Sequence, residues 1–500
     1  MAKTVTLPFP SGGLNARDPL DAMPATDAWE MRNILPRSGY GEFVGDGVIF
    51  HDAAGSGGDV KTAITAAYLG SEKLFVCYGG KIVLVLTSST ETDLKTGQTV
   101  DNWQHAFINN TLVMVNGADQ PQQISSVPAI SDAVYTIIAD DNKLVDVTVY
   151  QSRLYFIEKD TTKMWYGATN ATTGALTAFD LATVIKKGGT LEWISSWTES
   201  TGSGLQDYLV IMTSQGEMLV YAGDDPAANF YLVGRFYVGK PLSRRGKENI
   251  GADLWFLTRD GMLSAADVMR GNGNAGKYKA LTDKIQNVYR DRVTTYGSAV
   301  GWEIFNYPRG NLVLINIPPT VDLSGNGDYG WQYVMNTETG AWCELFIMYP
   351  AWTWTLFAET AVYGGKAHTA RAFNPTGVFA TVGDGIYLAR VSWAYNDLGA
   401  RGFDKHVQMI RPTISDFSDF DSGFGTLATN VGVYGELGTT PGGGLVSIGT
   451  FTAAGGNVNR WVGATTYSKL ISPAMSFTVT SINARINNVQ LMYEPATEPF

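Results

Sequence analysis

The densest run of cationic side chains lies between residues 240 and 247, and it could bind phosphate groups. The candidates, together with an upstream lysine pair, are Lys240, Arg244, Arg245, Lys247, Lys186 and Lys187. Lysine and arginine hold phosphates and carboxylates through charge-assisted hydrogen bonds. We therefore interpret these side chains as candidate contacts to DNA or to the carboxylates of a neighbouring subunit. A solvated loop is the simpler interpretation of the same pattern.

Two further segments have the composition of ligand-binding loops but lack decisive residues. Residues 270–278 read RGNGNAGKY, which departs from a P-loop because tyrosine replaces the final serine or threonine that would reach magnesium. Asp416, Asp419 and Asp421 could gather calcium, but their spacing matches no EF-hand loop and the bidentate glutamate is missing. We expect a structural loop in the first case and a solvated turn in the second.

The remaining polar residues form no catalytic constellation in the sequence. The four histidines, His51, His105, His368 and His406, show no local metal-ligand spacing, and the Gly-x-Ser-x-Gly elbow of serine hydrolases does not occur. A glycosidase needs two carboxylates across a pocket, and many acidic residues qualify equally. Glu338 lies in a turn that loosely resembles the Asp-box of sialidases but lacks its aspartate. We therefore predict no enzyme activity, no cofactor and no metal ion.

The composition indicates a large β protein suited to permanent contact with partners. A chain of 500 residues exceeds what one hydrophobic core usually supports, and its 56 glycines supply turns for many short hairpins. Only 17% of the residues are charged, which leaves broad uncharged surface for partner subunits. The net charge of −11 argues against a conventional nucleic-acid binder, although a like-charged wall would let DNA slide past without holding it.

The cysteines and the N-terminal residues indicate the compartment of synthesis. Cys77 and Cys343 lie far apart in apolar runs, so we expect buried thiols and no disulfide. The first residues contain no apolar signal region, and the longest apolar runs have the length of strands. We expect neither export nor a membrane-spanning segment, and hence synthesis in the cytoplasm.

A short cassette of strand, tight turn and strand recurs along the chain and predicts the architecture. The copies occupy residues 74–86, 105–115, 147–157, 209–221, 254–264, 302–317 and 379–391. Their spacing brackets the roughly 40 to 50 residues of a four-stranded propeller blade, and closure into a ring would remove exposed strand edges. We predict a β-propeller-like domain of about five to seven blades, in which each hairpin supplies two strands of a blade.

Shifts in composition divide this mainly β chain into three parts. Residues 1–57 are rich in proline and lack periodicity, so we expect an extended N-terminal arm. Residues 58–393 hold the propeller-like domain with insertions, including a short helix over 282–290 with Thr282 as its N-cap. Residues 394–500 alternate strand-like segments with turns rich in glycine and serine, which predicts a C-terminal β-sandwich.

The N-terminal region contains a Gly-Gly-Leu-Asn arm and an Arg-x-Gly-Tyr turn, and its landmark residues are Gly12, Gly13, Leu14, Asn15, Asn33 and Arg37. This pattern resembles the start of the tail nozzle or hub proteins of short-tailed bacteriophages. Further landmarks similar to those of the family follow in the same order. They are two strands flanking Asp260 and Gly261, a helix around Lys284, and a Thr-Gly-x-Trp segment that ends at Trp342.

This resemblance implies a structural virion protein of the tail. Copies of the chain would form a homohexameric ring that closes the tail tube, retains packaged DNA and lets it exit on infection. The implied partners are tail adaptor or portal-side proteins, tail fibres and the double-stranded DNA that passes through the lumen. The arm would contribute to assembly, so loss of residues 1–40 is expected to impair assembly more than folding of the propeller.

Two other functions fit the same fold prediction. The propeller could dock tail fibres or host carbohydrate as its main task. A virion glycosidase acting on a cell-surface polysaccharide is the least supported alternative. The turn at residues 45–47 lacks the arginine of the family pattern, which leaves open whether the chain is the nozzle or another tail or adaptor component.

Overall fold

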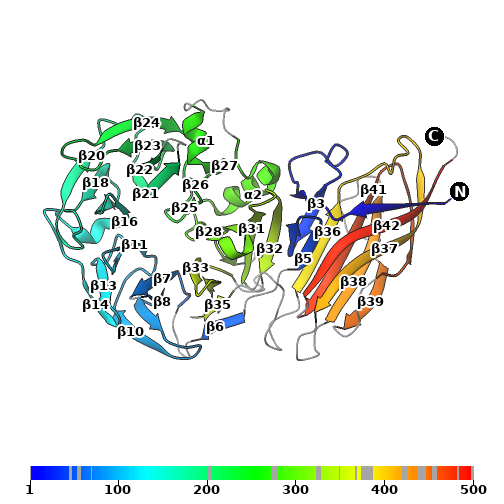
Figure 1. Ribbon diagram of the computed structural model, residues 1–500, viewed down its shortest axis with the longest axis horizontal. Coiled ribbons are helices and arrows are strands. Elements are labelled where there is room, and N and C mark those ends of the chain that lie inside the picture. Colours follow the sequence, from blue (N-terminus) through cyan, green and yellow to red (C-terminus); the bar gives the residue numbers. More distant parts are fainter. Residues whose placement is uncertain are drawn as a thin grey trace.

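Two modules, a ring of small sheets and a β-sandwich, lie side by side in the computed structural model of the protein (Figure 1). Strands make up most of the regular secondary structure, which confirms the mainly β fold class. The structure describes residues 2–43, 48–52, 58–68, 70–200, 204–271, 279–321, 328–347, 350–365, 369–372, 387–418, 426–435, 446–452, 459–480 and 483–496.

The ring is a seven-bladed β-propeller, and its first four blades each contain four antiparallel strands. The first blade consists of β7 (Thr62–Tyr68), β8 (Ser71–Tyr78), β9 (Lys81–Val85) and β10 (Glu91–Thr96). The second consists of β11 (Gln104–Ile108), β12 (Thr111–Val115), β13 (Gln122–Ser126) and β14 (Ala129–Asp132). The third consists of β16 (Leu144–Tyr150), β17 (Arg153–Glu158), β18 (Lys163–Tyr166) and β20 (Thr177–Asp180). The fourth consists of β21 (Leu191–Ser200), β22 (Leu205–Thr213), β23 (Glu217–Ala222) and β24 (Tyr231–Tyr237).

Of the last three blades, the fifth departs from this plan. The fifth has three strands, β25 (Lys247–Ile250), β26 (Asp253–Thr258) and β27 (Gly261–Ser264), followed by the helix α1 (Ala265–Arg270). The sixth consists of β28 (Glu303–Tyr307), β29 (Leu312–Asn316), β31 (Asp328–Asn336) and β32 (Trp342–Ile347). The seventh consists of β33 (Thr353–Phe357), β34 (Thr360–Gly364), β35 (Thr369–Ala372) and β6 (Val48–Asp52).

Most of the predicted hairpins form two strands of a blade. The pairs β8–β9, β11–β12, β16–β17, β22–β23, β26–β27 and β28–β29 correspond to six of the predicted cassettes. The turn between β11 and β12 places Asn109 and Asn110 at φ values of 47° and 59°, a geometry that matches the right-handed twist of paired strands. The seventh predicted cassette, at 379–391, lies largely outside the described residues, and the seventh blade uses the hairpin β33–β34 instead.

Apolar side chains between neighbouring blades hold the ring together. Phe75 and Ile82 of the first blade pack with Leu112 and Met114 of the second, and all four are fully buried. Complete burial of such a side chain stabilises the folded state by about 1.5 to 3 kcal/mol. Similar clusters join the second blade to the third and the third to the fourth.

A strand from the N-terminal region closes the ring. β6 runs antiparallel to β35, with Ile49 opposite Arg371, and completes the seventh blade. The prediction of an extended arm over residues 1–57 is therefore wrong for this segment. β6 pairs with residues 369–372, which lie more than 300 positions further along the chain. A pairing over this distance leaves no local signal in the sequence.

The second module is a β-sandwich built from both ends of the chain. One sheet contains β1 (Lys3–Pro8), β4 (Ile34–Arg37), β5 (Tyr40–Phe43), β37 (Lys405–Ser418), β40 (Val462–Ser468) and β42 (Asn483–Pro495). The other contains β2 (Gly13–Leu14), β3 (Asp27–Arg32), β36 (Tyr387–Trp393), β41 (Ile471–Thr480), β38 (Thr426–Gly435) and β39 (Val446–Thr452). Phe43 of the first sheet meets Phe477 of the second edge to face, with ring centroids 4.9 Å apart.

The sandwich differs from the predicted C-terminal domain in its boundaries. Residues 3–43, expected in an extended arm, supply five of its strands, and β36 precedes the predicted boundary at residue 394. The sheet that contains β2 and β3 also continues into the sixth blade, where the short strand β30 (Thr320–Val321) pairs with β31, so that one 11-stranded sheet runs through both modules. Propeller and sandwich are therefore joined by backbone hydrogen bonds.

The predicted helix is present but begins with a different geometry. A 3₁₀ turn, η2 (Asp283–Ile285), leads into α2 (Gln286–Tyr296). Thr282 does not cap the helix through its side chain, because its hydroxyl accepts a hydrogen bond from the backbone N–H of Met262 at 3.1 Å. Within the described part of the chain, no helix combines the length and the apolar character needed to cross a membrane.

Candidate functional site

The predicted Gly-Gly-Leu-Asn arm lies at the junction between the two modules. Its strand β2 runs parallel to β3 and to β32, so that Gly13 is paired with Asp27 of the sandwich and with Trp342 of the sixth blade. Gly13 adopts φ +77°, and a Cβ atom built on it would lie 2.6 Å from the backbone nitrogen of Trp342. Only glycine fits a position that combines a left-handed backbone with this close approach.

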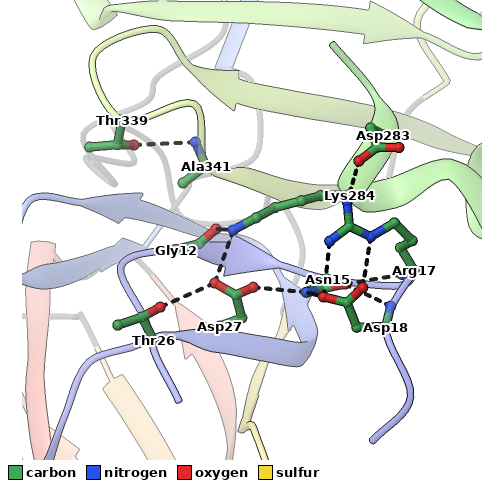
Figure 2. Close-up of polar contacts among 10 residues, drawn as sticks. All are labelled: Gly12, Asn15, Arg17, Asp18, Thr26, Asp27, Asp283, Lys284, Thr339 and Ala341. Carbon is green, nitrogen blue, oxygen red and sulfur yellow. Dashed lines mark hydrogen bonds and ion pairs between the residues drawn. The ribbon is translucent and has the colours of Figure 1, made fainter. Parts of the chain in front are cut away.

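A buried hydrogen-bond network follows directly after Gly13 (Figure 2). The side-chain amide of Asn15 donates to carboxylate oxygens of Asp27 and Asp18, both at 2.8 Å. Lys284, from η2 of the propeller, donates to Asp27 at 2.9 Å and to the carbonyl oxygen of Gly12 at 3.1 Å. The Asp27 carboxylate is almost inaccessible to water, at 1% exposure, so its charge depends on these partners.

A more exposed ion-pair cluster lies beside this network. Arg17 bridges Asp18, at 2.7 Å from its Nε atom, and Asp283 of η2. The hydrogen bond from Arg17, together with a second from Asn15, lowers the pKa of Asp18 to about 2. Backbone contacts add to this link, since the Ala16 N–H donates to the carbonyl oxygen of Lys284 at 2.8 Å.

The other two predicted arm residues tie the same modules together. Asn33, at φ 55°, donates to the carbonyl oxygens of Phe346 and Leu388 and accepts from the Phe346 N–H. Arg37 donates to the carbonyl oxygen of Gly310 at 2.8 Å and pairs with Glu42 at 2.9 Å. Asn33 and Arg37 therefore add further hydrogen bonds to the joint between the sandwich and the propeller.

A second candidate site is the centre of the propeller. A cavity of about 470 Å³ is lined by residues from the innermost strand of every blade: β7, β11, β16, β21, β25, β28 and β33. A smaller cavity of about 330 Å³ lies against it, and Gln104, Arg244 and Arg245 line both. The two cavities therefore adjoin at these three residues, and together they are called the channel below.

Arg245 is the centre of the channel's polar network. Its guanidinium donates to the carbonyl oxygens of Lys61 at 2.7 Å and Trp103 at 3.1 Å, and to the hydroxyl of Thr62. It also lies 3.8 Å from the carboxylate of Glu303, whose pKa is raised to about 7 by burial. One side chain thus links the first, second and sixth blades.

The other two channel cations also have carboxylate partners. Lys247 pairs with Asp146 of the third blade and lies 5.7 Å from the ring centre of Trp193, and burial lowers its pKa. Arg244 lies 3.6 Å from Glu192 of the fourth blade. The charges of the channel wall are therefore largely compensated within the protein.

Glu248 and His105 face the larger cavity from opposite blades. Burial, with a smaller contribution from the negative charge of Glu303, raises the pKa of Glu248 to about 8. The His105 side chain is exposed to the channel, but the surrounding blades desolvate its charged form, and this desolvation, with the charges of Arg245 and Lys247, lowers the pKa of His105 to about 4. Both side chains are therefore mainly neutral near pH 7.

The structure separates the cationic residues that the sequence groups together. Arg244, Arg245 and Lys247 line the channel, whereas Lys186, Lys187 and Lys240 are exposed elsewhere. The backbone N–H groups of Lys186 and Lys187 donate to Glu217, and the Lys187 ammonium lies 4.9 Å from the ring centre of Tyr237. The carboxylates Asp146, Glu192 and Glu303 were missed from sequence, because nothing local marks them as partners of the arginine run.

The predicted metal and nucleotide motifs gain no ligand geometry from the described residues. Among these residues, no group of three or more His, Cys, Asp or Glu side chains is placed to hold a metal ion. Asp419, Asp421 and most of the P-loop-like segment, residues 272–278, lie outside the described residues. Cys77 and Cys343 are buried and free, which confirms the prediction of two thiols.

Comparison with known proteins yields distant structural likenesses. No protein-family model matches the sequence, and no curated protein matches it. The chain is similar to YCF48 bound to D1 peptide (9% identity, 70% of this chain and 99% of that chain, TM-score 0.40). It is also similar to the WD40 β-propeller domain of Doa1 (10% identity, 67% of this chain and 97% of that chain, TM-score 0.41). A third likeness is to an exo-β-1,3-galactanase from Phanerochaete chrysosporium (10% identity, 79% of this chain and 98% of that chain, TM-score 0.26). These likenesses are too distant to bear on function, and the propeller assignment rests on the sheet topology.

Proposed function

We propose that the chain is a structural subunit of the tail of a short-tailed bacteriophage. In this proposal, copies of the chain form a homohexameric nozzle or hub that closes the tail tube, retains packaged DNA and releases it on infection. Its neighbours would be the tail adaptor or portal-side proteins and the tail fibres.

The observation that carries the proposal is that landmarks scattered along the sequence meet at one place. Gly13 of the arm pairs with Trp342, and Lys284 bonds to the carbonyl oxygen of Gly12. The side-chain amide of Asn336 donates to the carbonyl oxygen of Pro36 at 2.9 Å. The residues behind the family resemblance thus build a rigid joint between two modules, which suits a building block better than a catalytic pocket.

The propeller channel itself does not suit passage of DNA. The major groove of B-DNA alone is about 12 Å wide, whereas the space inside the ring consists of cavities of only about 470 and 330 Å³, lined by residues of all seven blades. We infer that DNA would pass between subunits and not through one propeller. The chain's acidic balance, with a net charge of −11, favours a wall that does not hold DNA.

The experiment is to measure the mass of the purified protein by light scattering and to image it with the other tail proteins. A ring, alone or on an isolated tail, is the expected result. A strict monomer that joins no tail would contradict the proposal.

A second candidate function is a propeller that binds a ligand or a tail fibre. It is favoured by the water-accessible cavity in the channel, because such cavities are the usual binding sites of closed β folds. Glu248 and Glu303 face that cavity together, so the purified protein should also be tested for release of sugar from host envelope material. Sugar release that disappears in Glu303→Gln would replace the structural role with an enzymatic one.

A further inference from the structure

We propose that the larger cavity of the propeller channel binds one unit of a neutral, polyhydroxylated ligand such as a sugar residue, with Glu248 and His105 as its principal hydrogen-bond partners. This inference develops the second candidate function, binding by the propeller. It does not depend on whether the chain assembles into a tail.

The cavity has the size and the convergent polar lining of a small-molecule site. Its volume of about 470 Å³ falls within the roughly 300 to 1,000 Å³ that ligand pockets occupy. His105 enters it from the second blade, Glu248 and Asn249 from the fifth, and Asn306 from the sixth. Polar groups therefore reach one space from strands whose positions are fixed by the ring.

The charge balance of the cavity favours a neutral ligand. Lys247 is paired with Asp146, and Arg244 with Glu192. Arg245 donates its N–H groups to two carbonyl oxygens and a hydroxyl, and its guanidinium lies 3.8 Å from the Glu303 carboxylate. An anionic ligand would have to displace these partners, and a cationic ligand would find their carboxylates already paired with cations of the protein.

Glu248 and His105 are the titratable groups of the cavity that remain to bind a ligand. Neither side chain makes a hydrogen bond or ion pair with another described residue, although both line the cavity. In their neutral forms, a carboxylic acid and an imidazole each offer one donor and at least one acceptor. A hydroxyl group has the same dual capacity, so neighbouring hydroxyl groups of a sugar can satisfy both residues.

The cavity wall also offers apolar surface to the C–H groups of a sugar ring. Leu356, which is 36% exposed, and Phe305, whose ring is stacked on Trp354 with centroids 5.6 Å apart, line the same cavity. A sugar ring presents C–H groups as well as hydroxyls, so a wall of mixed polarity suits it better than it suits an inorganic ion.

Binding should weaken as the solution becomes alkaline. The groups that face Glu248 are Glu303, Lys247, Arg244, Arg245, Asp146 and His105. The pKa of Glu248 is raised to about 8, so its donor proton is lost as the pH rises through that value. His105, with a pKa lowered to about 4, stays neutral over the same range.

The test is ligand-observed NMR and calorimetry of the full chain with glucose, galactose, mannose and N-acetylglucosamine, followed by a glycan array. We expect millimolar binding of at least one sugar at pH 6 to 7, and weaker binding above pH 8. Glu248→Gln should keep the affinity at pH 6 within about threefold and reduce the loss of binding above pH 8; the pH dependence that remains is that of Glu303, whose pKa is raised to about 7. Glu248→Leu and Asn306→Leu should each lower the affinity at least tenfold, whereas the control Glu359→Gln, on a side chain that is 81% exposed, should change nothing.

Three results would overturn the inference. They are silence across the whole sugar panel and array, unchanged binding in Glu248→Leu with an unaltered melting temperature, and displacement of bound sugar by inorganic phosphate. The last result would assign the cavity to an anion. Sugar binding by a strict monomer would contradict only the tail proposal, and ring formation without sugar binding would contradict only this inference.

Discussion

Lys284 of the propeller donates a hydrogen bond at 2.9 Å to Asp27 of the sandwich, and this contact lies at the centre of the joint between the modules. Asp27 is nearly inaccessible to water, and Asn15 holds its second carboxylate oxygen. Removal of one partner from such a buried pair leaves an uncompensated charge, which costs more than the pair itself contributes. The contact therefore makes the fold of one module depend on the other.

Lys284→Met is expected to lower the free energy of unfolding by about 3 kcal/mol, because the Asp27 carboxylate would stay buried without its cation. Urea denaturation followed by tryptophan fluorescence measures this change. The matched control is Lys279→Met, since Lys279 is 71% exposed and pairs with Asp283 at the surface. Equal effects of the two substitutions would refute a special role of the Asp27 contact.

Gly13→Ala should destabilise the protein by about 3 kcal/mol or more, since both the left-handed backbone and the clash with Trp342 oppose a side chain. Gly39→Ala provides the comparison. Gly39 has φ +86°, but a Cβ atom there meets nothing within 4 Å, so only the backbone cost of about 1 to 2 kcal/mol applies. A thermal melt in which both variants lose the same stability would mean that the close approach at Gly13 is unimportant.

Stability should fall as the pH rises from about 4.5 to 8, because of the channel carboxyl groups. Burial raises the pKa of Glu303 to about 7 and that of Glu248 to about 8, from the ordinary value of 4.5, so the folded state retains protons that the unfolded state has released. The two carboxyl groups make their full contribution to the free energy of unfolding below pH 4.5. This contribution is lost as the pH rises above their folded-state pKa values of about 7 and 8. His105 has the opposite effect on stability: because its pKa is lowered from 6.5 to about 4, its contribution is lost as the pH falls through this range.

Unfolding free energies measured between pH 5 and 9 test this dependence. In the variant Glu248→Gln, the slope above pH 6 should become shallower, with the control Glu359→Gln unchanged. A slope that is the same in both variants would show that Glu248 does not titrate abnormally.

The two thiols should react only after unfolding. Burial raises the pKa of both Cys77 and Cys343, and the thiolate is the reactive form. We expect slow reaction with Ellman's reagent in the native protein and rapid reaction of two thiols per chain in denaturant. Rapid labelling of the native protein would mean that one of these regions opens readily.

The sequence predicted the propeller well where the signals are local. Turns such as Asn109-Asn110 lie between two apolar strands, and this pattern located six of the blade hairpins. The hairpin β33–β34 was missed because its turn residues, Ala358 and Glu359, are not typical of turns, although both adopt positive φ. Closure of the ring by β6 was missed because strand pairing across the whole chain has no local pattern.

The sites were predictable only in part for the same reason. The run from Arg244 to Lys247 is visible in the sequence, but Asp146 and Glu303, which convert it into a compensated network, come from other blades. The arm motif was found, yet its pairing with Trp342 changes its interpretation. Loss of residues 1–40 would remove strands from the sandwich, so it should impair folding of the chain as well as assembly.

The oligomeric state of the purified chain, measured by light scattering and by single-particle imaging with the other tail proteins, tests the central proposal most directly. The tail proposal predicts a closed ring with six times the mass of one chain, formed alone or on the tail. A protein that stays monomeric under every condition and is never incorporated into a tail would contradict it.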